Sequence, residues 1–150
     1  RMNPEEFAAA AGIPENGFHP MVFLHGEPHI GSGVYIGLFS EVNANGTTVE
    51  IGDECDIASF VSINGADSHL KCIGLKDEID RQPIRLDNNV FVGSHCVILG
   101  PTHIGHHSVV AAGSVIKGIQ APPYSLIAGN PATVTPGHYA NRESEPSDTP

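Results

Sequence analysis

An aliphatic residue returns every six positions along most of this chain. A period of six matches neither the 3.6 residues of a helical turn nor the two of a flat strand, so it predicts short strands separated by sharp corners and wound as a solenoid. The aliphatic places are Ile30, Ile36, Val42, Ile51, Ile57, Ile63, Leu86, Val92, Ile98, Ile104, Val110 and Ile116. A small or β-branched residue holds the fifth place of most units: Val34, Ser40, Cys55, Val61, Val90, Cys96, Thr102, Ser108 and Ser114.

Three such hexapeptides would close one triangular coil. Each aliphatic residue then points into the prism and stacks on its counterpart one coil away, at the strand spacing of about 4.8 Å. Five of the aliphatic residues are followed by glycine, and we expect these glycines to supply corner dihedrals that a side chain resists. The phase slips by three residues near Gly46 to Val49 and is interrupted once, at residues 65–83. The sequence therefore predicts an all-β solenoid with a projecting loop.

The rest of the chain divides around this repeat. The first residues show the pattern of a helix, with Asn3 as its cap, Pro4 in its first turn and Gly12 as its stop signal. Residues 1–16 are therefore expected to form a short N-terminal helix and a linker. Residues 17–136 are assigned to the solenoid, and the polar residues 137–150 to a mobile tail. No run is apolar enough to span a bilayer and no leader pattern begins the chain, which predicts a cytoplasmic protein.

Charge and cysteine content limit the function classes. The chain has 17 acidic and 7 basic residues, a formal net charge of −10, which makes nucleic acid and anionic membranes poor partners. Cys55 and Cys96 occupy small places of the repeat, so buried thiols are expected rather than disulfides. Five of the basic residues cluster in or near the interruption and the last coil, and they leave room for an anionic small ligand: Lys71, Lys76, Arg81, Arg85 and Lys117.

The interruption at residues 65–83 is the first place to seek chemistry. A solenoid gains stability from unbroken stacking, so a long loop between two regular halves points to function. The loop contains a single histidine, His69, two residues after Asp67. An imidazole can accept and return a proton near neutral pH, which makes His69 the candidate general base.

Several motifs together carry a family resemblance. They are the repeat, the loop segment 67–69 (DSH), the segment 87–95 (DNNVFVGSH), the segment 112–115 (AGSV) and the segment 128–132 (AGNPA). In combination these motifs resemble the hexapeptide-repeat acyltransferases, and most of all the galactoside and maltose O-acetyltransferases and the N-acetyltransferases of nucleotide-linked amino sugars. The resemblance covers roughly residues 30–134.

The resemblance implies a left-handed parallel β-helix, an exception to the usual right-handed crossover, assembled as a homotrimer with active sites between subunits. It implies acetyl-CoA as co-substrate, no metal, and a sugar or nucleotide-sugar acceptor. His69 matches the catalytic base, and Ser94 the position whose backbone N–H lies near the thioester carbonyl. The implied cofactor contacts are Ser94, Ala112, Gly113, Lys117, Gly129, Asn130 and Pro131. The implied acceptor contacts are Asn43, Asn45 and Asp67.

The expected reaction is direct transfer. His69 would remove a proton from the acceptor hydroxyl or amine as that atom attacks the thioester, without a covalent enzyme intermediate. One alternative is a zinc enzyme resembling the γ-class carbonic anhydrases, but that family's pair of metal-binding histidines would fall on Ser94 and Leu99, which are not imidazoles. The other alternative is a non-catalytic structural subunit on the same scaffold. The motifs leave the acceptor, the choice between O- and N-transfer and the acyl length open.

Overall fold

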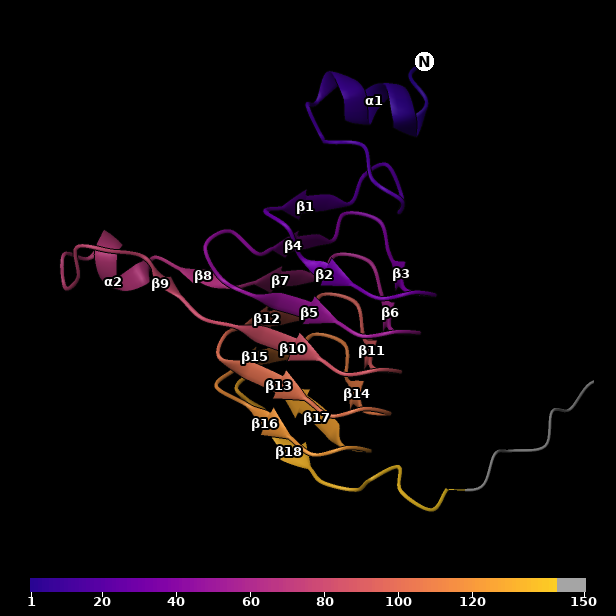
Figure 1. Cartoon of the computed structure of the whole chain (residues 1–150), viewed down its shortest axis with the longest axis vertical. Coiled ribbons are helices and arrows are strands. Elements are labelled where there is room, and N and C mark those ends of the chain that lie inside the picture. Colours follow the sequence, from indigo (N-terminus) through magenta and orange to yellow (C-terminus); the bar gives the residue numbers. More distant parts are fainter. Residues whose placement is uncertain (143–150) are drawn as a thin grey trace, which may run out of the picture.

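A computed structural model describes residues 1–142 of the chain. Short parallel strands wind into a triangular prism, which is the left-handed parallel β-helix expected for this repeat (Figure 1). The prism has about five coils, and each coil contributes one strand to each of three sheets. The all-β class, the projecting loop and the N-terminal helix are thus confirmed.

The strands of each sheet have the following bounds. The first sheet holds β1 (Phe23–His25), β4 (Glu41–Asn43), β7 (Ser62–Asn64), β12 (Val97–Leu99) and β15 (Val115–Lys117). The second holds β2 (His29–Ile30), β5 (Val49–Ile51), β10 (Ile84–Leu86), β13 (Thr102–Ile104) and β16 (Gln120–Ala121). The third holds β3 (Tyr35–Ile36), β6 (Asp56–Ile57), β11 (Phe91–Val92), β14 (Val109–Val110), β17 (Leu126–Gly129) and β18 (Ala132–Thr135).

Strand register reproduces the period and both of its breaks. Phe23 pairs with Glu41, 18 residues on, which is three hexapeptides per coil. Glu41 pairs with Ser62, 21 residues on, because the three-residue slip lies between them. Ser62 pairs with Val97, 35 residues on, because the loop lies between them. Both breaks therefore leave the stacking of strands intact and place the extra residues outside the prism.

The core is a set of stacked aliphatic side chains. All twelve repeat positions are buried except Ile30, which is half-buried at the first coil. The small residues of the fifth place are buried as well, with Val34 as the half-buried exception. Buried serines in these places are satisfied locally; Ser114, for example, donates its hydroxyl hydrogen to the carbonyl of Ala111. No buried side-chain polar atom among residues 1–142 lacks a hydrogen-bond partner.

The expected reason for the glycines that follow the aliphatic residues is wrong. None of these glycines has a positive φ. They are required because the next coil is too close: a Cβ on Gly93 would lie 2.6 Å from the backbone nitrogen of Ala112, and one on Gly105 would lie 2.4 Å from that of Pro123. The left-handed corner conformation belongs to a different place, which non-glycine residues such as Phe60 and His95 also occupy.

Both ends of the prism are covered. At one end lies α1 (Pro4–Ala10), which begins with a capping box in which the Asn3 side chain accepts from the Glu6 N–H and the Glu6 carboxylate accepts from the Asn3 N–H. At the other end, β18 turns back and pairs antiparallel with β17. At this end β18 occupies the free edge of the third sheet, whereas β15 and β16 are the edge strands of the other two. Of the expected tail, residues 143–150 lie outside the described residues.

Two corners of the prism hold most of the residues that the sequence singles out as site candidates. The corner between the first and second sheets, called here the loop corner, comprises residues 44–48, 65–83, 100–101 and 118–119. The corner between the third and first sheets, called here the aromatic corner, comprises residues 37–40, 58–61, 93–96 and 111–114. Both breaks in the repeat lie at the loop corner, and the long one projects far from the prism (Figure 1).

Candidate active site

The projecting loop is a hairpin that carries a short helix. Strands β8 (Ala66–Asp67) and β9 (Asp80–Arg81) pair antiparallel at its root. The helix α2 (His69–Cys72) follows β8 directly. The hairpin can leave the prism here because Gly65 lies against the preceding corner, where a Cβ would be 2.3 Å from the Thr47 methyl carbon. The root of the loop therefore lies directly against the solenoid.

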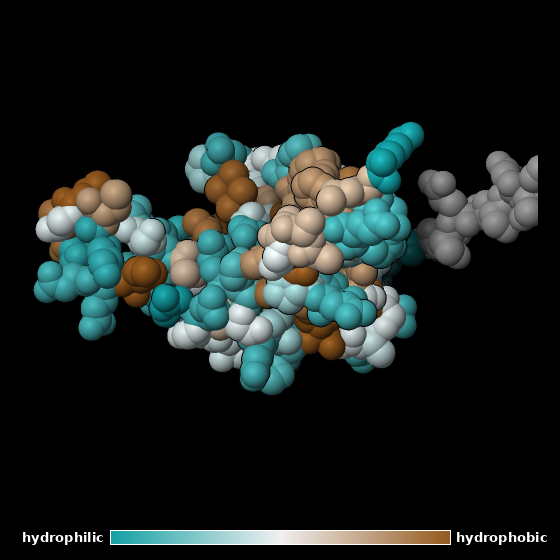
Figure 2. All heavy atoms as spheres, turned by 90° about the horizontal axis from the view of Figure 1, so that it is seen from above, coloured by the Kyte–Doolittle hydropathy of each residue, from teal (hydrophilic) through white to brown (hydrophobic). Residues whose placement is uncertain are grey.

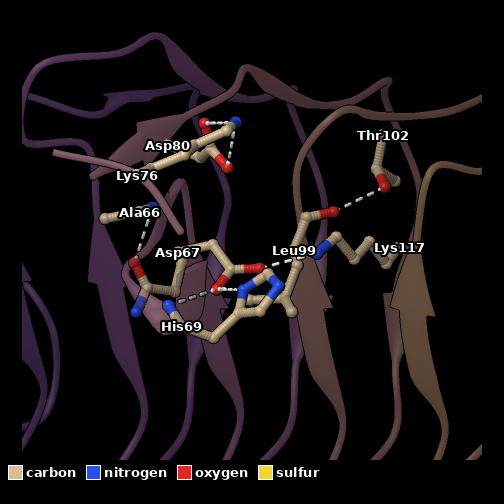
Figure 3. A network of polar contacts seen from close by, with 9 residues as sticks. Ala66, Asp67, His69, Lys76, Asp80, Leu99, Thr102 and Lys117 are labelled. Atoms are coloured by element: carbon tan, nitrogen blue, oxygen red, sulfur yellow. Dashed lines mark hydrogen bonds and ion pairs between the residues drawn. The ribbon is translucent and has the colours of Figure 1, made fainter. Parts of the chain in front are cut away.

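Asp67 holds the candidate base His69 in place. One oxygen of Asp67 lies 2.5 Å from Nδ1 of His69, and the other lies 2.6 Å from Nζ of Lys117 (Figure 3). The Lys117 ammonium, and after it the His69 ring, hold the pKa of the Asp67 carboxyl far below its usual range. An ionised carboxylate only accepts hydrogen bonds, so Nδ1 of His69 carries the proton and Nε2 is left as the basic nitrogen.

The shorter break in the repeat contacts the loop. Arg81 of β9 donates from its guanidinium to the carbonyl of Asn45, and its side chain packs against Gly46, where a Cβ would be 2.7 Å from Cδ of Arg81. In the same turn the side-chain oxygen of Asn43 accepts from the Asn45 N–H at 3.0 Å. The predicted acceptor residues Asn43 and Asn45 thus lie at the same corner as the loop that carries His69.

A small polar cavity lies at the root of the loop, with a volume of about 270 Å³. Two ion pairs border it, Lys117 with Asp67 and Lys76 with Asp80, the second at 2.7 Å. Asn64 and Gln82 add side-chain amides. The Asn64 side-chain oxygen accepts from the Ala66 N–H, so its amide hydrogens remain as donors. The cavity therefore offers donors and acceptors side by side, next to the carboxylate that holds His69.

The residues predicted to contact the cofactor lie mostly at the aromatic corner. Ser94 and Ala112 occupy equivalent places on successive coils, since the Gly113 N–H donates to the carbonyl of Ser94. Within residues 1–142, the backbone N–H groups of Ser94 and Ala112 donate to no protein acceptor. The turn of Gly129, Asn130 and Pro131, between β17 and β18, continues the line, and the Gly129 N–H donates to the Ser114 hydroxyl. Lys117 lies apart from this line, at the end of β15 beside the loop.

One chain does not bring His69 and Ser94 together. His69 leaves from the loop corner, whereas Ser94 lies at the aromatic corner, on the other side of the first sheet. Two parts of the predicted site are thus each well formed within the chain: the base with its carboxylate, and the line of free backbone donors.

Burial distinguishes the three cysteines as the repeat predicts. Cys55 and Cys96 are buried in the repeat, and Cys72 is exposed on α2. Burial raises the pKa of the Cys55 and Cys96 thiols. Both buried thiols donate to backbone carbonyls, Cys55 to that of Asp87 and Cys96 to that of Ala111. These two thiols are structural.

Sequence reasoning missed the contacts that organise the loop. Nothing in the six-residue pattern indicates that Arg81 reaches the Asn45 turn or that Lys117 reaches Asp67, because each contact joins a residue of the projecting loop to a different coil. The short spacing between Asp67 and His69 was a usable signal, since a carboxylate two residues before a histidine can bond its ring. In residues 1–142 no helix has the length and apolar character needed to cross a membrane.

Comparisons with known proteins agree with this architecture. The model of the bacterial transferase hexapeptide family (six repeats) matches residues 83–118. The galactoside O-acetyltransferase of Escherichia coli (strain K12) is 36% identical over 118 residues, which are 77% of this chain and 57% of that protein. Serine acetyltransferase 4 of Arabidopsis thaliana is 34% identical over 110 residues, covering 73% of this chain and 28% of that protein. The chain thus spans between about a quarter and three fifths of these two relatives.

Solved structures extend the likeness to the fold. A hexapeptide-repeat acetyltransferase of Vibrio cholerae, complexed with acetyl coenzyme A, has a TM-score of 0.53 and 26% identity, over 75% of this chain and 68% of that one. The N-acyltransferase AntD of Bacillus cereus, in complex with dTDP and 3-hydroxybutyryl-CoA, has a TM-score of 0.67 and 19% identity, over 77% of this chain and 65% of that one. With these likenesses, the repeat and the loop in view, the chain has the hexapeptide-repeat, left-handed parallel β-helix architecture and is similar to the acyltransferases that share it.

Proposed function

We propose that the protein transfers an acetyl group from acetyl-CoA to a hydroxyl or amino group of a sugar or nucleotide-linked sugar. The observation that carries the proposal is the contact of Asp67 with Nδ1 of His69, which leaves Nε2 of the ring free to accept a proton. The relative from E. coli is a galactoside O-acetyltransferase, and the similar structure from V. cholerae holds acetyl coenzyme A. These likenesses support both the acyl donor and the acceptor class.

The chemistry follows from the two halves of the site. Nε2 of His69 takes the proton of the acceptor hydroxyl or amine while the acceptor atom attacks the thioester carbonyl carbon. The carbonyl oxygen becomes an oxyanion, and the free N–H of Ser94 is suited to donate to it. When the tetrahedral intermediate collapses, the carbon–sulfur bond breaks and the thiolate of coenzyme A takes the proton from the imidazolium. The Asp67 carboxylate keeps the ring oriented and stabilises its charged form.

The line of residues along the aromatic corner fits an extended acyl carrier. The free N–H group of Ala112 can donate to an amide carbonyl of a pantetheine arm, and Gly113 leaves its approach open because nothing lies within 4 Å of its Cβ position. The turn at Gly129, Asn130 and Pro131 continues the same line toward the nucleotide end of the carrier. Asn43 and Asn45 lie on the acceptor side, at the loop corner.

We further propose a homotrimer with the active site between subunits. His69 and Ser94 lie at different corners of one convex prism, so a second prism alongside is needed to bring them to one substrate. We also propose that the protein acts in the cytoplasm, since its proposed donor is acetyl-CoA. A sedimentation experiment that gives a monomer with full affinity for coenzyme A would refute this assembly.

The proposed activity is tested by release of free thiol from acetyl-CoA in the presence of candidate acceptors. The panel contains free sugars, galactosides, nucleotide-linked amino sugars and amino acids. His69→Ala should lower turnover by about 10²- to 10⁴-fold with the preferred acceptor, the usual contribution of a positioned general base. His29→Ala is the matched control, because His29 is exposed on the second sheet. If the parent protein neither binds coenzyme A nor releases thiol with any acceptor, the proposal fails and a structural role is favoured.

A further inference from the structure

The aromatic corner becomes apolar on the coils that precede Ser94. One coil earlier, the place of Ser94 is held by Ser59, because the His95 N–H donates to the carbonyl of Ser59. Another coil earlier it is held by Leu38, because the Phe60 N–H donates to the carbonyl of Leu38. Both residues are half-buried, so both remain accessible from outside the prism. The line of free backbone donors that begins at Ser94 therefore leads to an apolar side chain on its N-terminal side.

Two phenylalanine rings form a wall beside this line. The rings of Phe39 and Phe60 lie 5.4 Å apart on successive coils, and the ring of His95 stacks on that of Phe60 at 5.0 Å. Phe39 and Phe60 are 51% and 47% exposed. Large apolar side chains that adjoin one another and stay exposed are typical of a ligand-binding groove, whereas single exposed ones are ordinary.

A largely apolar cavity lies at the end of the wall, between α1 and the first coil. It has a volume of about 630 Å³, and its lining includes Phe7, Met21, Leu38 and Phe39. Met21 continues the line of Leu38, because the Phe39 N–H donates to the carbonyl of Met21. Seen from the α1 end, hydrophobic residues lie over this end of the prism (Figure 2). The residues Met21, Leu38, Phe39 and Phe60 are called here the apolar track.

The proposed path of the acyl carrier points its acyl group at this track. With the nucleotide end near Gly129 and the thioester at Ser94, the carrier runs along the corner toward the N-terminal coils. An extended acyl group leaves the thioester in the same direction. Two strand spacings of about 4.8 Å separate the coils of Ser94 and Leu38, a path of about 10 Å. An extended hydrocarbon advances about 1.3 Å per carbon, given bonds of about 1.5 Å, so the path spans about eight carbons.

We propose that the apolar track binds the hydrocarbon part of a medium-chain acyl group, of about six to eight carbons, carried by coenzyme A. The proposal rests on the proposed function, which supplies the direction of the carrier. An acetyl group ends beside Ser94 and leaves both phenylalanines uncovered, whereas a hexanoyl or octanoyl chain covers Phe60 and then Phe39. The longer chain removes its own methylenes and the two rings from water, which favours its binding. The protein would then transfer such acyl groups as well as acetyl, by the same attack on the thioester carbon.

Binding of coenzyme A thioesters tests the track without any acceptor. The affinities of acetyl-, butanoyl-, hexanoyl-, octanoyl- and decanoyl-CoA are measured by isothermal titration calorimetry, below the concentrations at which they form micelles. We expect the affinity to rise about two- to fourfold per added methylene up to about eight carbons and then to level off. An affinity that does not depend on chain length overturns the proposal.

A blocked track gives a second measurement. Ser59→Phe places a ring one coil from Ser94, so the rise in affinity should stop at about four carbons. Phe60→Ser removes part of the wall and should make the rise shallower. Ser32→Phe is the matched control, because Ser32 is an exposed serine at the corner between the second and third sheets, and it should keep the profile of the parent protein. If Ser59→Phe keeps that profile, or if both Phe variants shorten it equally, the chain lies elsewhere and the proposal is wrong.

Transfer assays separate this proposal from the proposed function. If acetyl-CoA serves as donor but affinity does not rise with chain length, the binding of a medium-chain acyl group is refuted and the proposed activity stands. If affinity rises and Ser59→Phe shortens the profile while no acceptor is acylated, the apolar track stands and the proposed activity is refuted.

Discussion

The Nζ of Lys117 and the carboxylate of Asp67 lie 2.6 Å apart although the two residues are 50 positions apart in the chain. Lys117 ends β15 on a regular coil, and Asp67 ends β8 in the projecting loop. The same carboxylate contacts Nδ1 of His69 with its other oxygen. A coil two windings beyond the start of the loop thus holds the residue that orients the candidate base. We propose that this contact lets Asp67 and Lys117 position His69, and the proposal gives a separate prediction for each residue.

Asp67→Asn should lower kcat by roughly 10- to 10⁴-fold with little change in KM for acetyl-CoA. The reason is the tautomer: an amide can donate to Nδ1, which moves the ring proton to Nε2 and removes the base. The measurement is steady-state kinetics with the preferred acceptor. Asp67→Glu is the companion variant and should recover part of the rate. A rise in acceptor KM alone would instead assign Asp67 to acceptor binding, as the family resemblance implied.

The Lys117→Met variant should lower kcat less than Asp67→Asn does, and it separates a positioning role of Lys117 from a cofactor-binding role. An exposed ion pair contributes about 0.2–1 kcal/mol, so loss of the tether should reduce kcat by about 2- to 5-fold and leave KM for acetyl-CoA unchanged. If Lys117 binds the cofactor, KM for acetyl-CoA should rise and kcat should hold. Lys71→Met, at an exposed lysine of α2 for which the structure shows no ion pair within residues 1–142, is the control.

Asp67 should make its full contribution to the stability of the protein above about pH 4 and a progressively smaller one below it. Because the folded pKa of Asp67 is far below the unfolded value of about 3.9, its contribution is fully present above that value and is lost as the pH falls toward the folded pKa. The difference in Tm between the parent and Asp67→Asn should therefore be constant between pH 7 and pH 5 and shrink by pH 3. Thermal denaturation at these three values checks it. A difference that grows on acidification would contradict the ion pair.

Changing either of two glycines to alanine should destabilise the protein, for a different physical reason at each position. Gly105→Ala places a Cβ 2.4 Å from the backbone nitrogen of Pro123 and should lower the free energy of unfolding by about 1–3 kcal/mol. Gly113→Ala meets nothing within 4 Å but sits at φ +73°, so it should cost about 1–2 kcal/mol from backbone strain alone. Gly17→Ala, which has open space and no left-handed φ, should leave stability unchanged or slightly raised. Urea unfolding of the three variants measures each effect.

Thiol labelling should separate the three cysteines by their surroundings. In the native protein one thiol should react promptly with an aromatic disulfide reagent at neutral pH, and Cys72→Ser should abolish that phase. Burial, together with the raised pKa values of Cys55 and Cys96, should delay the other two until the protein unfolds. Prompt labelling of two or three native thiols would show that the repeat opens around them.

The repeat made most of the fold predictable because its cause is local and recurrent. Ile57, Ile63 and Val92 are buried since each occupies the same place of a hexapeptide, and the breaks could be located wherever that phase was lost. The glycines were located correctly but explained wrongly: the one-dimensional pattern marks Gly93 and Gly105 without telling whether dihedral freedom or lack of space selects them. Only the distance from each glycine to the next coil distinguishes these two explanations.

The site was predictable only in part, for a similar reason. His69 could be selected as the sole histidine of the interruption, and the motifs around Ser94 and Gly129 carried a family resemblance. The contacts of Arg81 with Asn45 and of Lys117 with Asp67 could not be foreseen, because loop residues have no periodicity that sets their direction. A side chain outside the stack is positioned by whichever distant group it reaches.

The sequence by itself determined the solenoid, its three-residue slip, its long loop and the residues of its core. The reason is that the aliphatic residues recur at a fixed period, and this period predicts which positions are buried. Only the tertiary structure decided that both breaks lie at one corner and that Asp67 joins His69 to Lys117. The tertiary structure also decided that Ser94 and His69 lie at different corners, since the winding of the chain determines at which corner or on which of the three faces each residue lies. That separation is a property of the closed prism, and it is the physical reason that the proposed site needs a second copy.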